Sequence, residues 1–105
     1  MIAPKVTVGT DAAGVRLILC SGEFDLDTTG LLVKVCGEAA PAEPLILDVT
    51  QVTFADSSFL NALIRVRNSR PLALRGPLPK QLLRVMEMTG ALALFEIRDG
   101  TGRTR

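Results

Sequence analysis

The chain has 105 residues, 48% of them hydrophobic, with two cysteines and no histidine, tyrosine or tryptophan. This length and apolar content allow one domain that buries a core without disulfide staples, so we expect a single domain over residues 1–105. The formal net charge of +1, with acids and bases interspersed, excludes the strong field that attracts nucleic acids or anionic membranes. Without histidine, the commonest general base and metal ligand is missing, so we expect no enzyme, no metal and no cofactor.

The N-terminal residues lack the basic-then-apolar pattern of a signal peptide. No apolar run approaches the length that is needed to span a bilayer. We therefore expect a cytoplasmic protein that has no membrane partner.

The N-terminal residues predict a β-hairpin. Residues 5–8 alternate polar and apolar side chains, residues 11–14 supply a turn, and residues 15–20 are mostly apolar. The second strand should therefore be the more buried one, and Cys20 within it is interpreted as a small buried hydrophobe.

A helix should follow a turn at Gly22. Either Asp25 or Asp27 is a suitable N-cap for this helix. Its apolar positions recur at helical spacing, at Leu31, Leu32, Val35, Cys36 and Ala39. Cys36 lies on this stripe, which favours a second buried thiol over a disulfide or redox pair.

The middle of the sequence is its most informative part. Residues 45–49 form an apolar run broken only by Asp48, which is typical of a central strand covered on both faces. Residues 50–55 predict a short turn. A helix then opens on one acid and two hydroxyls, at Asp56, Ser57 and Ser58.

An acid and hydroxyls at a helix start form an ordinary cap, because their oxygens accept hydrogen bonds from unpaired backbone N–H groups. The same position also suits a phosphate, since those N–H groups and the helix dipole favour negative charge. A nucleophile elbow is not indicated, because the Gly-x-Ser-x-Gly frame and a histidine are missing.

An aspartate phosphoacceptor at Asp48 would need further acids around it. Asp11, Asp25 and Asp27 do not follow apolar strands in the way that such a pocket requires. We interpret Asp48 as organising the loop after its strand.

The helix that begins at the serines carries a polar stripe. Asn61, Arg65 and Asn68 recur at i, i+4 and i+7, whereas much of the remaining circumference is apolar. Because it begins next to the serines, this stripe is a candidate docking ridge. Ordinary exposure to solvent explains it equally well.

The C-terminal part predicts a short strand at residues 71–76, a helix introduced by two prolines and stopped at Gly90, and a last strand at residues 92–97. Residues 98–105 are interpreted as a frayed tail. The alternation of strands and helices predicts an α/β fold: a sheet of about four or five strands, largely parallel with an N-terminal hairpin strand, flanked by helices.

Three blocks of the sequence carry a resemblance over nearly its whole length. They are Gly-Glu-Phe-Asp at residues 22–25, the strand and hydroxyl segment at residues 45–58, and the helix at residues 82–90 followed by Phe95. In this order they resemble the anti-sigma factor antagonists, the single-domain STAS proteins of bacterial partner-switching systems. That family's fold, a sheet flanked by helices, agrees with the predicted architecture.

The resemblance implies a binding switch. The unphosphorylated chain would bind an anti-sigma factor that is also a serine kinase, and would thereby free a sigma factor. Phosphorylation on Ser57, with Ser58 as the alternative acceptor, would end this binding, and a separate serine phosphatase would reset it. The implied partner surface consists of Asp25, Asp56, Ser57, Ser58, Phe59, Asn61 and Arg65.

One position departs from the family's pattern, because Phe59 stands where the glycine after the two hydroxyls is usual. We expect its ring on the docking surface, since a core site built around glycine would have no room for it. The departure also keeps a second interpretation open. In this alternative, the chain is a STAS module that binds a protein or a small ligand independently of phosphorylation.

Overall fold

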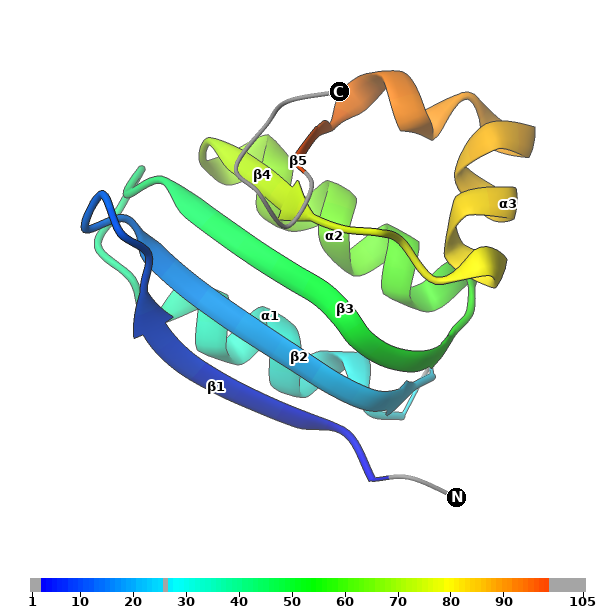
Figure 1. Ribbon diagram of the computed structural model, residues 1–105, viewed down its shortest axis with the longest axis horizontal. Helices are drawn as coiled ribbons and strands as arrows, with labels where there is room; N and C mark the ends of the chain where they lie inside the picture. Colours follow the sequence, from blue (N-terminus) through cyan, green and yellow to red (C-terminus); the bar gives the residue numbers. More distant parts are fainter. Residues whose placement is uncertain (1–2, 26, 99–105) are drawn as a thin grey trace.

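In the residues that the computed structural model describes, 3–25 and 27–98, five strands form one sheet in the order β1-β2-β3-β4-β5 (Figure 1). β1 is antiparallel to β2, and every other neighbouring pair is parallel. The elements in chain order are β1 (Lys5–Thr10), β2 (Arg16–Phe24), α1 (Thr29–Gly37), β3 (Leu45–Ala55), α2 (Ser57–Ser69), β4 (Leu72–Arg75), α3 (Lys80–Thr89), the 3-10 helix η1 (Ala91–Leu94) and β5 (Glu96–Arg98). The predicted fold class is confirmed.

The β1–β2 hairpin turns at Asp11, whose carboxylate accepts the N–H groups of Ala13 at 2.9 Å and Val15 at 2.8 Å. Gly14 supplies the left-handed conformation of the turn, with φ of 84°. β1 is mostly exposed, whereas most of β2 is buried or half-buried, as the sequence predicts.

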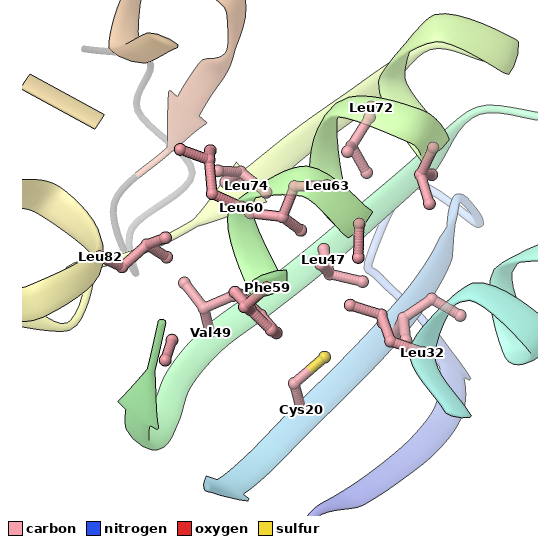
Figure 2. Close-up of a cluster of buried hydrophobic side chains, with 14 of the residues drawn as sticks. Cys20, Leu32, Leu47, Val49, Phe59, Leu60, Leu63, Leu72, Leu74 and Leu82 are labelled. Carbon is pink, nitrogen blue, oxygen red and sulfur yellow. The ribbon is translucent and has the colours of Figure 1, made fainter. Parts of the chain in front are cut away.

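The main core lies between the sheet and the helices α1 and α2, which cover one of its faces (Figure 1). Figure 2 shows Leu32 of α1 and Phe59 of α2 directed toward Cys20, Leu47 and Val49 of the sheet. All five side chains are buried, and such burial of apolar area is the main force that holds the layers together. None of the helices in the described ranges has the length and apolar character that crossing a membrane requires.

β3 is buried on both faces over its first half, as its apolar run predicts. Leu45 and Leu47 belong to the main core, and Ile46 joins Leu17 and Ala73 in a small cluster of their own. The expected turn at residues 50–55 is wrong, because β3 continues to Ala55. After an irregularity in the register, residues 21–24 of β2 pair with this second half of β3 and keep it extended.

The cysteines are free and buried, as predicted. Burial raises the pKa of the Cys36 thiol to about 11, against a smaller opposing effect of Arg70. Burial also strongly raises the pKa of Cys20, with smaller contributions from the neighbouring Cys36 and Asp48. Both thiols therefore stay protonated and serve as core residues.

The end of the sheet differs from the predicted strand at residues 92–97. Gly90 stops α3 in a left-handed conformation, with φ of 78°, as expected, but η1 follows and β5 begins only at Glu96. A short apolar run such as Ala91–Leu94 does not distinguish strand from helix by its periodicity. Arg98 belongs to β5 rather than to a frayed tail, and residues 99–105 lie outside the described residues.

Candidate functional site

Asp56 caps the N-terminus of α2. Its backbone is extended, with φ of −101° and ψ of −170°, and its carboxylate accepts the N–H groups of Ser58 at 2.9 Å and Phe59 at 3.4 Å. The Ser58 hydroxyl donates a further hydrogen bond to the same carboxylate oxygen. The acid and the second hydroxyl of the segment therefore both serve the cap.

Ser57 is the first residue of α2 and is exposed. Its hydroxyl makes no hydrogen bond to the part of the chain that the structure describes. The N-terminal N–H groups of the helix give this position a partial positive charge. Of the two hydroxyls, Ser57 is thus the one that is both accessible and in a field that favours an anion.

Phe59 lies inside the protein, so the expectation that its ring forms part of the docking surface is wrong. Its exposed fraction is 0%, and its ring contacts that of Phe24 with centroids 5.2 Å apart and planes at 54°. Phe59, Leu63 and Val66 recur at i, i+4 and i+7, and all three are buried. The helical period therefore turns the third residue of α2 toward the sheet while Ser57 faces out.

Asp25 lies in the turn between β2 and α1. Its carboxylate accepts the N–H of Asp27 and the hydroxyl of Thr28, both at 3.0 Å. Thr28 is the N-cap of α1, so the expectation that Asp25 or Asp27 takes this place is wrong. Phe24 and Ala55 are paired at the carboxyl ends of β2 and β3. The turn with Asp25 and the segment with Ser57 therefore start side by side, at the carboxyl ends of two neighbouring strands.

Asn61 and Arg65 are exposed on α2, as their spacing predicts. Together with Ser58 they line a groove of about 520 Å³ between α1 and α2. The opposite side of this groove includes Thr29 and Lys34 of α1. Sequence patterns did not single out these two residues, because only the packing of α1 beside α2 brings them next to the α2 stripe.

Asp48 lies within β3 and not before a loop. Its carboxylate accepts the N–H of Thr50 at 2.9 Å and the Thr50 hydroxyl at 2.6 Å, and Arg75 of β4 lies 3.8 Å away. These contacts stabilise β3 next to the point where its pairing with β2 becomes irregular. Among the described residues, no three acidic or thiol side chains gather in an arrangement that could hold a metal ion.

Residues 7–96 match a family model described as "Mlab, STAS domain". The chain belongs to the STAS domain family. Among solved structures, this STAS domain is similar to the crystal structure of an anti-sigma factor antagonist from Mycobacterium paratuberculosis, with 23% sequence identity and a TM-score of 0.67. The likeness covers 90% of this chain and 85% of that chain, and it shows a shared fold. A comparison with curated proteins finds no match.

Proposed function

We propose that this STAS domain is an anti-sigma factor antagonist, which binds an anti-sigma factor and thereby frees a sigma factor. The observation that carries the proposal is the Ser57 hydroxyl, which lies exposed at the first residue of α2 beside the Asp56 cap. The similar solved structure is that of an anti-sigma factor antagonist, which supports the same role here. Such a role belongs in the cytoplasm, where sigma factors act.

The proposed switch is phosphorylation of Ser57 by a partner that is both anti-sigma factor and serine kinase. A phosphate adds about −1.5 to −2 charges at neutral pH. At the N-terminus of α2 this charge is compatible with the fold, because the helix dipole favours it. In an interface that excludes water the same charge is costly, so binding is lost while folding is kept. A separate serine phosphatase would restore the binding form.

Ser57 is a better acceptor than Ser58 for a structural reason. The Ser58 hydroxyl donates to Asp56, and a phosphate on it would place two negative groups in contact within the cap. Modification of Ser57 requires no hydrogen bond of its hydroxyl to be broken among the described residues. We therefore propose Ser57 as the phosphorylated residue.

The proposed partner surface comprises the turn after β2 and the exposed face of the first half of α2. Its outward-facing members are Asp25, Asp56, Ser57, Ser58, Asn61 and Arg65, all exposed or half-buried. Phe59 supports this surface from inside and does not contact the partner directly. The chain supplies binding alone, and the catalytic steps belong to the kinase and the phosphatase.

The second candidate function is a STAS module that binds its partner independently of phosphorylation. Phe59, in place of the usual glycine, is the feature that favours it. The burial of the ring weakens this argument, because the side chain does not obstruct the approach to Ser57.

The test is to mix the chain with the anti-sigma factors of the same organism, with and without ATP, and to follow complexes by size-exclusion chromatography and intact mass. We expect one complex that ATP dissociates, with a single phosphate located on Ser57. The Ser57→Ala variant should form the same complex and keep it in the presence of ATP. A complex that survives ATP without any phosphate would favour the second candidate, and no complex at all would contradict both the antagonist role and the switch.

A further inference from the structure

The groove between α1 and α2 is cationic. Two hollows of about 520 Å³ and 210 Å³ share Val33 and Arg65 and so adjoin each other, and we call the two together the α1–α2 groove. Besides these two residues, its lining includes Lys34, Ser58, Ala62 and Arg70. No acidic side chain is among its lining residues in the part of the chain that the structure describes.

Between their caps, the two helices that form the groove carry basic residues and no acid. The whole chain is nearly neutral, with 12 basic and 11 acidic residues, yet Thr29–Gly37 and Ser57–Ser69 contain no Asp or Glu. Lys34 and Arg65 are exposed and make no hydrogen bond or ion pair with other described residues. Both cations are therefore available to a partner, whereas Arg70 donates to the Ala40 carbonyl oxygen.

We propose that the α1–α2 groove binds a short acidic segment of the partner protein. An apolar side chain of that segment would rest against Val33 and Ala62, and carboxylates on either side would pair with Lys34 and Arg65. The inference rests on the proposed function, since it names the chemistry of the protein that the proposed partner surface binds.

Nucleic acid fits the groove less well than an acidic peptide. Proteins that bind single strands stack bases on aromatic side chains, and none of the described residues that line this groove is aromatic. Affinity for a phosphate backbone also grows with the number of phosphates neutralised, and two free cations contribute little. The groove instead offers the apolar Val33 and Ala62 together with two free cations. This lining suits a peptide in which carboxylates flank an apolar residue.

The position of the groove also gives the switch a specific electrostatic mechanism. Ser58 lines the groove, and Ser57 precedes it at the same end of α2. A phosphate on Ser57 would face the carboxylates of the bound segment, and like charges in a partly desolvated site repel strongly. Phosphorylation would then end binding by repulsion without any change in the fold.

The test uses a defined probe. The isotope-labelled chain is titrated with a short synthetic peptide of leucine and glutamate, and with a matched peptide in which glutamine replaces glutamate, while NMR follows the backbone amides. We expect saturable binding of the glutamate peptide, with shifts confined to α1 and α2, and about tenfold weaker binding of the glutamine peptide. Binding of the glutamate peptide should also weaken as salt is added.

The matched variants are Lys34→Glu combined with Arg65→Glu, and the control Arg84→Glu, an exposed position on α3 outside the groove. The double variant should lose about tenfold in affinity for the glutamate peptide, and the control should not change. If the double variant does not fold, Lys34→Gln with Arg65→Gln replaces it.

A single-stranded oligonucleotide is titrated in the same way. Several results would overturn the inference: no saturable peptide binding, equal affinity for both peptides, shifts outside α1 and α2, or tighter binding of the oligonucleotide in the groove. The titration needs no anti-sigma factor. Its failure therefore leaves the proposed function standing, and failure of the proposed function leaves the titration result unaffected.

Discussion

The rings of Phe24 and Phe59 contact each other with centroids 5.2 Å apart, and this contact joins the end of β2 to the first turn of α2. Both side chains are fully buried. Two residues before Phe59, Ser57 faces solvent. The candidate phosphorylation site is thus an exposed hydroxyl on a helix start that is held to the sheet by an aromatic pair.

Truncation of Phe59 should therefore destabilise the fold. Phe59→Ala removes a buried ring and leaves a cavity, so the free energy of unfolding should fall by about 3–5 kcal/mol. Urea denaturation followed by circular dichroism measures this. Phe54→Ala is the matched control, because Phe54 on β3 is 38% exposed, and it should cost much less. Equal losses in the two variants would contradict a core role for Phe59.

The Asp56 cap gives a second prediction. Asp56→Ala removes the acceptor of the Ser58 and Phe59 N–H groups and should cost about 1 kcal/mol of stability, with a range of about 0.5–2. Asp56→Asn should retain most of that stability, since asparagine caps helices about as well as aspartate. Thermal and urea unfolding of the two variants side by side provide the measurement. If Asp56→Asn is no more stable than Asp56→Ala, the charge of the carboxylate, and not its capping hydrogen bonds, stabilises the helix start.

The two serines should respond differently to a negative charge. Ser57→Asp should leave the melting temperature nearly unchanged, because the new carboxylate is exposed at a helix N-terminus. Ser58→Asp should lower it clearly, since the hydroxyl that donates to Asp56 is replaced by a like charge. Calorimetric scans of both variants test this. A fall for Ser57→Asp as large as that for Ser58→Asp would show that Ser57 is a structural residue.

The buried thiols predict a loss of stability at alkaline pH. The pKa of Cys36 is raised by burial from about 9 to about 11, so the folded state holds this proton more tightly than the unfolded chain does. The resulting contribution to stability is complete below about pH 9 and is lost as the pH rises toward 11. Unfolding free energies at pH 8 and pH 10 should therefore differ less in Cys36→Ala than in the parent chain. An equal difference in both would contradict a protonated, buried thiol at this position.

Much of the architecture was predictable from local patterns. The alternation of residues 5–8, the apolar run at residues 45–49 and the left-handed stop at Gly90 each have a local cause, and each prediction is confirmed. The second half of β3 was mispredicted as a turn, although Thr50, Val52 and Phe54 are residue types that favour strands. Its pairing with the end of β2 agrees with that preference. η1 was mispredicted because its apolar residues fit a strand equally well.

The candidate site was predictable only in part. A helix start at Asp56, Ser57 and Ser58 follows from their chemistry, and the exposure of Asn61 and Arg65 follows from helical spacing. The inward direction of Phe59 was mispredicted from the glycine that the family has at this position. The helical period that Phe59 shares with the buried Leu63 and Val66 indicates the correct direction. No sequence pattern marked Lys34 as a binding residue, since the groove that it lines forms only when α1 packs beside α2.

The most direct test of the central claim is the affinity of the anti-sigma factor for two forms of this chain, unmodified and with phosphoserine incorporated at position 57, measured by titration calorimetry. We predict tight binding of the unmodified chain and a loss of at least about tenfold, or about 1.4 kcal/mol, on phosphorylation, with unchanged thermal stability. Equal affinity of the two forms would contradict the claim that a phosphate on Ser57 is the switch.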